Sequence, residues 1–123
     1  MGLPKEHRLK SWREFRLVYQ KGSKHYSSHL ILRALSVSTT ELQSPDSHTL
    51  VGISISTKVS KKAVIRNSIK RRIKAAVREL LPEMGNCWLI VVVVKTSAVK
   101  CSYVDFLREL EQLFKQSNII NGY

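Results

Sequence analysis

Apolar residues recur with the two-residue period of a β-strand in two segments of the chain. Residues 50–56 alternate strictly between aliphatic and small side chains, and residues 30–37 place mostly apolar side chains on each face of the predicted strand. Residues 88–94 form an unbroken apolar run rich in valine, which is typical of a strand that is covered on both faces. The pattern therefore predicts three strands. The Ser- and Thr-rich residues 38–48 predict a surface loop.

Two other segments have the three- and four-residue spacing of amphipathic helices. In residues 9–22 the positions with this spacing are Trp12, Phe15, Val18 and Tyr19. We expect Ser11 to cap this helix, Glu14 to complete a capping box and Gly22 to end it. In residues 103–114 the side chains predicted to point inward are Val104, Leu107, Leu110, Leu113 and Phe114.

A third helix, predicted over residues 66–80, carries a basic row beside an apolar one. At about 100° per residue, one face presents Arg66, Lys70, Lys74 and Arg78, with Asn67 and Arg71 beside them. The adjoining sector holds Ile65, Ile69, Ile73, Ala76, Val77 and Leu80. Like charges four residues apart destabilise a helix, and the first acidic residue is Glu79. The row therefore indicates an external polyanion.

The order of these elements predicts an α+β fold. A strand, the basic helix and a second strand form a βαβ unit, which is usually parallel. With helices near both ends of the chain, we expect a small two-layer α/β sandwich of about four strands and three helices. Residues 1–123 form a single domain by length, with residues 1–8 as a flexible N-terminal tail.

The charge of the chain selects the class of partner. The sequence has 21 Lys and Arg residues against 9 Asp and Glu, a net charge of +12, and a pI near 10.1. Nucleic acid is the leading partner, because neutralising phosphates releases counterions. An anionic membrane is the alternative, but it favours Trp, Phe or Leu on the apolar face, and the Ile, Ala and Val residues here indicate an ordinary core.

The sequence contains none of the familiar catalytic or metal-binding patterns. The acidic residues are scattered, no glycine-rich phosphate loop is present, and the four histidines lack the spacing of a metal site. Cys87 and Cys101 also lack metal-ligand spacing, and they are most simply reduced thiols. The first residues are charged where a secretory signal is apolar. We therefore expect a cytoplasmic protein with no metal bound by this chain.

Two further features suggest contacts with nucleic acid, each with a simpler alternative. Residues 54–62 combine small hydroxyl side chains and lysines just before the basic helix, which favours an anion, although Ser60 would also serve as a helix cap. Phe15 and Tyr19 lie four residues apart on the first helix. Such rings stack on unpaired bases beside a cationic groove or simply fill a core.

Several short motifs along the chain resemble those of a known protein family. They are Leu3-Pro4-Lys5, Arg8-Leu9, Phe15-x-x-Val18-Tyr19-x-x-Gly22, Val51-Gly52-Ile53-Ser54, Lys58, and the run from Ala63 to Arg71. In this order and spacing they are similar to the protein subunit of bacterial ribonuclease P. The resemblance extends from Leu3 to the last helix, and the Arg-Asn-x-x-Lys-Arg helix after a Gly-Ile-Ser strand is its most specific part.

The resemblance implies a left-handed βαβ crossover, and we expect the protein itself to be monomeric. The resemblance also implies a catalytic RNA partner that removes the 5′ leader of precursor tRNA, using Mg²⁺ held mainly by the RNA. The residues implied to bind the catalytic RNA are Lys58, Ser60, Lys61, Lys62, Arg66, Asn67, Lys70, Arg71, Lys74 and Arg78. Those implied to line a cleft for the leader are Arg8, Phe15, Tyr19 and Ser54.

Three positions depart from the family pattern. Ser68 and Lys74 stand where the family has arginine, and Thr57 replaces a lysine. Arginine and lysine are not equivalent at a bidentate contact. Arg72 would partly restore the charge lost at Ser68. A ribosomal RNA-binding protein, which has no part in an enzyme, is the alternative reading, because small basic α+β domains are common among such proteins.

Overall fold

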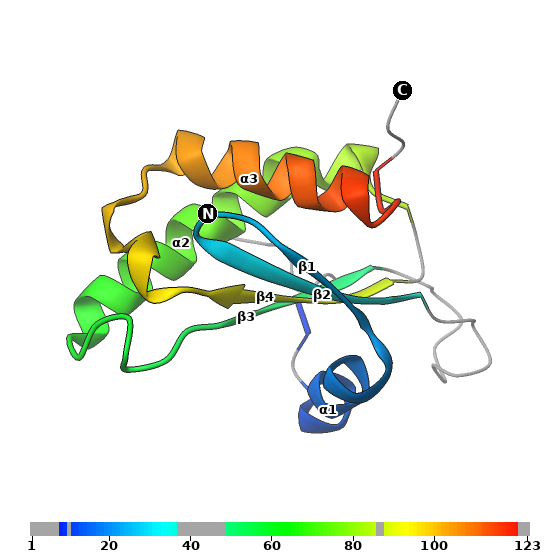
Figure 1. Ribbon diagram of the computed structural model, residues 1–123, viewed down its shortest axis with the longest axis horizontal. Coiled ribbons are helices and arrows are strands. Elements are labelled where there is room, and N and C mark those ends of the chain that lie inside the picture. The colour runs from blue at the N-terminus through cyan, green and yellow to red at the C-terminus, as the bar shows by residue number, and fades with distance from the viewer. Residues whose placement is uncertain (1–7, 10, 37–48, 86–87, 121–123) are drawn as a thin grey trace.

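The computed structural model describes residues 8–9, 11–36, 49–85 and 88–120. Its centre is a four-stranded mixed sheet in the order β1-β2-β4-β3 (Figure 1). The strands are β1 (Ser23–Tyr26), β2 (Leu30–Ser36), β3 (Leu50–Ser54) and β4 (Trp88–Val94). The helices are α1 (Trp12–Lys21), α2 (Ala63–Leu80) and α3 (Tyr103–Gln116), with short 3₁₀ turns η2 (Leu81–Glu83) and η3 (Thr96–Lys100).

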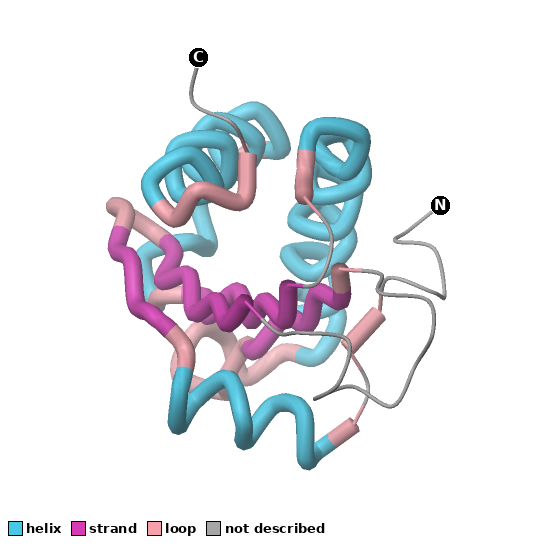
Figure 2. Tube along the Cα trace, turned by 90° about the vertical axis from the view of Figure 1, so that its right-hand side faces the viewer, coloured by secondary structure: helices cyan, strands magenta, loops and turns pink. Residues whose placement is uncertain are grey.

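The helices are divided between the two faces of the sheet. Helices α2 and α3 lie over one face, and α1 lies under the other (Figures 1 and 2). The predicted α+β class with three helices and four strands is confirmed. The two-layer description was incomplete, because α1 adds a third layer.

Strands β3 and β4 are parallel neighbours joined by α2, as predicted for a βαβ unit. The other two strand pairs are antiparallel. The left hand of the crossover remains an expectation from the resemblance. Because β3 pairs with a named strand only on its β4 side, it forms an edge of the sheet. Lys70 and Lys74 of α2 lie near residues of this strand.

Alternation along the strands separates two hydrophobic clusters. On β4, Ile90 and Val92 point into the large cluster with α2 and α3, whereas Leu89 and Val91 join a smaller cluster with Leu9 and residues of α1. All four of these β4 side chains are fully buried. Strand β4 is therefore covered on both faces, as its unbroken apolar run predicted.

Helix α1 differs in detail from its prediction. Ser11 precedes the helix with extended backbone, but its side chain makes no capping hydrogen bond, so the predicted capping box with Glu14 is absent. Trp12 was predicted to share the apolar face, yet it is 73% exposed. Val18 supplies the buried contact instead. The helix ends at Gly22 as predicted, where a Cβ would lie 2.5 Å from the Val18 carbonyl oxygen and 2.9 Å from that of Ala34.

Other boundaries shift by a few residues. Helix α2 begins at Ala63, three residues before the predicted start, and β3 ends at Ser54. In α3, Val104 was predicted to point inward but is exposed, and Phe106 is fully buried in its place. The predicted loop 38–48 lies outside the described residues, as do residues 1–7 of the predicted tail.

Candidate nucleic-acid interface

A hollow at the β3 edge joins the two surfaces that the sequence predicted separately. It has a volume of about 180 Å³. Its lining residues are Arg8, Leu9, Phe15, Val51, Gly52, Ile53, Lys70 and Lys74. An aromatic ring from α1 and two lysines from α2 therefore face a common space across one strand. Of the predicted leader residues, Arg8 and Phe15 line this hollow, whereas Tyr19 and Ser54 do not.

The segment before α1 positions Arg8 at this edge. The backbone N–H of Leu9 donates to the carbonyl oxygen of Val51 over 3.0 Å, and Arg8 forms an isolated parallel bridge with Val51. The Leu9 side chain is buried in the cluster under α1. A short extended segment thus covers part of the open edge of β3 and brings a guanidinium to the hollow.

The Phe15 ring lies directly over Gly52. A Cβ atom built on Gly52 would be 2.5 Å from Cζ and 2.9 Å from Cε1 of Phe15. Glycine in a strand interior often marks such a close approach. The ring is half-buried, because its other contacts are with the cluster under α1. Phe15 is therefore both a packing residue and part of the hollow's wall.

Replacing Gly52 with alanine should force the Phe15 ring out of its position. Inserting an extra methyl group into a packed site costs about 1–3 kcal/mol of unfolding free energy. The check is a double-mutant cycle measured by urea denaturation. The cost of Gly52→Ala should largely disappear in a Phe15→Ala background, and equal costs in both backgrounds would show that the ring does not sit on Gly52.

Tyr19 lies against Arg33 of β2, outside the hollow. The Arg33 guanidinium carbon is 4.5 Å from the centre of the Tyr19 ring, and Nη2 of Arg33 donates to the Tyr19 carbonyl oxygen over 2.9 Å. The Tyr19 side chain is 37% exposed, so it is no ordinary core residue. An exposed ring backed by a guanidinium has a face suited to base stacking. Ser54, on the same face of β3 as Gly52, is half-buried.

The basic row of α2 is present, but its members differ in exposure. The side chains of Asn67, Arg71 and Arg78 are exposed, and those of Arg66, Lys70 and Lys74 are half-buried. Nη1 of Arg66 donates to the Ser60 carbonyl oxygen over 2.8 Å, so this arginine also anchors the loop before the helix. Lys70 and Lys74 line the hollow. These two lysines connect the basic row to the aromatic wall.

The loop before α2 keeps its lysines in solvent. Lys58, Lys61 and Lys62 are exposed. The Ser60 hydroxyl accepts a hydrogen bond from the Lys62 backbone N–H over 3.2 Å. Lys62 occupies the N-cap position of α2, and its side chain makes no capping hydrogen bond. Ser60 is therefore not the predicted helix cap. The first turn of α2 also has no acidic residue, which leaves its positive end uncompensated.

Arg72, which we expected to restore part of the charge missing at Ser68, lies against that residue. Nη2 of Arg72 donates to the Ser68 hydroxyl over 3.2 Å, and Nη1 of Arg72 donates to the Cys101 carbonyl oxygen over 3.0 Å. These two hydrogen bonds fix a guanidinium beside Ser68, one turn further along the helix. The sequence pointed to Arg72 but not to its second anchor, which is a backbone carbonyl 29 residues away.

Exchanging the two side chains should test whether Arg72 takes over the role of the missing arginine. We expect Arg72→Ala to weaken RNA binding, with a salt slope shallower by about 0.9 for one lost phosphate contact. The double change Ser68→Arg with Arg72→Ala should restore most of the affinity. Filter binding over a range of salt concentrations measures both quantities. If Arg72→Ala leaves affinity and slope unchanged, its guanidinium serves only to hold Cys101.

The described helices include none that is both long and apolar enough to cross a membrane. Within the described segments, the hollow brings together cationic, aromatic and small residues but no carboxylate or imidazole. It therefore offers binding groups, with no acid–base pair or nucleophile assembled there. Such a surface suits a polyanion with unpaired bases.

Comparisons with known proteins agree with this description. The family model Ribonuclease P matches residues 3–118. The ribonuclease P protein component of Microcystis aeruginosa is 47% identical over 123 residues, covering all of both chains. The Staphylococcus aureus RNase P protein structure superposes with a TM-score of 0.79 at 25% identity, covering 94% of this chain and 98% of that one. The Thermotoga maritima RNase P protein shares the fold, with a TM-score of 0.74 at 19% identity and coverage of 89% and 96%. The chain belongs to the ribonuclease P protein family.

Proposed function

We propose that this chain binds the catalytic RNA of ribonuclease P through α2 and holds the 5′ leader of precursor tRNA in the hollow at the β3 edge. Membership of the family makes the chain a subunit of an endoribonuclease that matures tRNA. The observation that carries the finer proposal is the shared hollow, where Lys70 and Lys74 face Phe15 across Gly52.

The division of roles follows from what the side chains can do. The row on α2, with Lys70 and Lys74 at its border with the hollow, and the lysines of residues 58–62 offer contacts to phosphates, which position an RNA without reading its sequence. Phe15 and Tyr19 offer ring faces to unpaired bases, which suits a leader of variable sequence. Arg8, in the lining of the same hollow, offers a guanidinium to the leader backbone.

The chemistry of cleavage belongs, in this proposal, to the RNA subunit. The described residues form no catalytic constellation at the hollow. Mg²⁺ supplies the metal chemistry when bound by the RNA, and the protein contributes by fixing the substrate. We also propose that the protein acts as a monomer in the cytoplasm. A small protein that holds one RNA on one side and a flexible strand on the other needs no second copy.

Direct binding measurements test the assignment to the catalytic RNA. A bacterial ribonuclease P RNA and a ribosomal RNA fragment of equal length should be compared by filter binding at the same salt concentration. We expect tight, saturable binding to the ribonuclease P RNA, and at least a tenfold preference over the fragment. Equal affinities for both RNAs would reduce α2 to a non-specific polyanion surface.

A further inference from the structure

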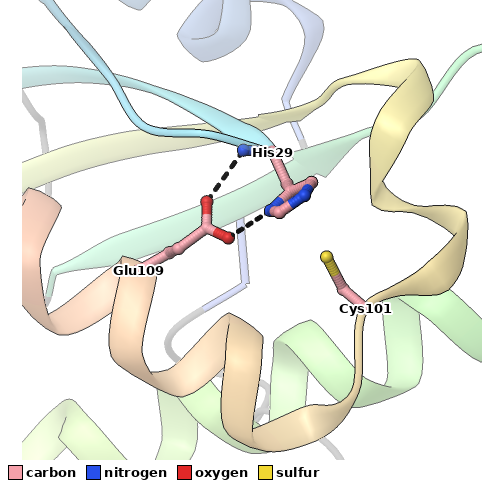
Figure 3. Close-up of side chains that lie close together, drawn as sticks. All are labelled: His29, Cys101 and Glu109. Atoms are coloured by element: carbon pink, nitrogen blue, oxygen red, sulfur yellow. Dashed lines mark hydrogen bonds and ion pairs between the residues drawn. The ribbon is translucent and has the colours of Figure 1, made fainter.

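A cluster of three potential metal ligands lies away from the hollow. His29 comes from the turn between β1 and β2, Cys101 from the segment between η3 and α3, and Glu109 from α3 itself. One ligand atom from each of these side chains lies within 4.8 Å of the others. Figure 3 shows the three side chains pointing toward one another.

The Glu109 carboxylate is held firmly in this cluster. Oε1 of Glu109 accepts from the His29 backbone N–H over 2.9 Å and from the Ser27 hydroxyl over 2.5 Å. Oε2 of Glu109 lies 2.5 Å from Nδ1 of His29. Although burial opposes ionisation, the hydrogen bonds from Ser27 and His29 outweigh it and keep the pKa of Glu109 below its usual value. The carboxylate is therefore a pre-positioned anion.

The three side chains of the cluster differ in their exposure to solvent. Cys101 is 4% exposed, and the side chains of Glu109 and His29 are 13% and 33% exposed. The imidazole thus gives the cluster its opening to solvent. Burial, together with the Glu109 and Asp105 carboxylates, raises the pKa of the Cys101 thiol against the opposing effect of Arg72. A metal ion at this site would therefore have to displace the thiol proton.

The donor set identifies the kind of ion. One imidazole nitrogen, one sulfur and one carboxylate oxygen suit Zn²⁺, whereas Mg²⁺ prefers oxygen ligands alone. Ligand atoms around tetrahedral zinc lie about 3.3–3.7 Å apart, as bond lengths of about 2.0–2.3 Å require. The cluster reaches this geometry when the imidazole and carboxylate separate slightly and the Cys101 sulfur moves inward by about 1 Å.

We propose that His29, Cys101 and Glu109 bind Zn²⁺, with a water molecule as the fourth ligand. On binding, the Cys101 thiol releases its proton to solvent, and the imidazole binds as the neutral form. The thiolate and carboxylate then balance both charges of the ion. The bound ion would connect the β1–β2 turn to α3 and to the segment before it. None of the three ligands lines the hollow at the β3 edge.

Cobalt is a spectroscopic probe of this site. Titrating the untagged full-length protein with Co²⁺ under reducing conditions should produce a thiolate-to-cobalt charge-transfer band in the near ultraviolet. One equivalent of Zn²⁺ should remove the band, and a large excess of Mg²⁺ should not. Cys87→Ala is the matched control for Cys101→Ala, since each removes one of the two thiols. The band should persist in the first variant and vanish in the second.

Thermal melts provide the second measurement. Zn²⁺ should raise the Tm of the wild type and of Cys87→Ala, because it binds only the folded cluster. His29→Gln, a change at a partly exposed position, should lower zinc affinity at least tenfold while the protein still folds. A wild-type titration with no charge-transfer band would overturn the proposal. A band or a Tm rise that survives both Cys101→Ala and His29→Gln would overturn it equally. RNA binding by the metal-free protein should be unchanged by His29→Gln.

Discussion

Replacing Lys70 and Lys74 together with alanine should weaken binding of the catalytic RNA on the order of 30-fold at 0.15 M salt. The figure follows from two lost phosphate contacts, each of which changes the slope of log K against log salt by about 0.9. The slope should therefore become shallower by about 1.8. Lys70 and Lys74 are better positions than Arg66 for this test, because Arg66 also anchors the Ser60 loop and its loss would disturb the backbone.

A charge-matched variant separates this contact from a general loss of positive charge. Arg108 and Lys115 on α3 make exposed ion pairs with Asp105 and Glu111. Helix α3 contributes no residue to the lining of the hollow. Changing both to alanine removes the same two charges. The RNA affinity of this α3 double variant should stay within a few-fold of that of the wild type. If the two double variants lose affinity equally, the row on α2 has no special role.

Phe15→Ala should weaken binding of precursor tRNA with a leader of several nucleotides by roughly 5- to 150-fold. Stacking of one base on an aromatic ring contributes about 1–3 kcal/mol. Mature tRNA, which has no leader, should bind the assembled enzyme almost as before. Tyr19→Ala should act in the same direction, because its ring is exposed and backed by Arg33. Fluorescence titration of the assembled enzyme with both RNAs measures the difference.

The half-buried position of Phe15 requires a control for stability. Truncating a fully buried phenylalanine costs about 3–5 kcal/mol, and Phe15 should cost less because one side of the ring faces the hollow. Leu17→Ala is the matched variant: Leu17 packs on the same cluster but does not line the hollow. It should lower the Tm without selectivity for the leader. Equal losses on leader-bearing and leaderless RNA in Phe15→Ala would end the stacking proposal.

The elements that sequence reasoning identified are those whose signal is local. Strand β4 is recognisable from its short valine-rich run and α2 from its two-sided pattern, and each signal lies within the segment itself. Strand β1 was missed because Ser23–Tyr26 is a short, mostly exposed edge strand with no aliphatic residue. This strand forms because it pairs with β2, and a pattern of four residues cannot indicate that pairing.

The parts of the site that depend on contacts across the fold were not predictable. The Trp12 error arose because a helix with few apolar residues has two faces that fit nearly equally well, and packing on the sheet selects the one with Val18. Lys70 and Phe15 line one hollow because Gly52, which lies between them, has no side chain to displace the Phe15 ring. The cluster of His29, Cys101 and Glu109 spans 80 residues and follows no ligand spacing.

The most direct test of the account is reconstitution of the enzyme. The protein should be incubated with a bacterial ribonuclease P RNA and a precursor tRNA at a Mg²⁺ concentration too low for the RNA to act alone. The account predicts that wild-type protein restores cleavage and yields a mature tRNA with a 5′-phosphate. It also predicts that the Lys70→Ala, Lys74→Ala double variant requires much more protein for the same rate. No stimulation of cleavage by well-folded wild-type protein, at concentrations where it saturates the RNA, would contradict the account.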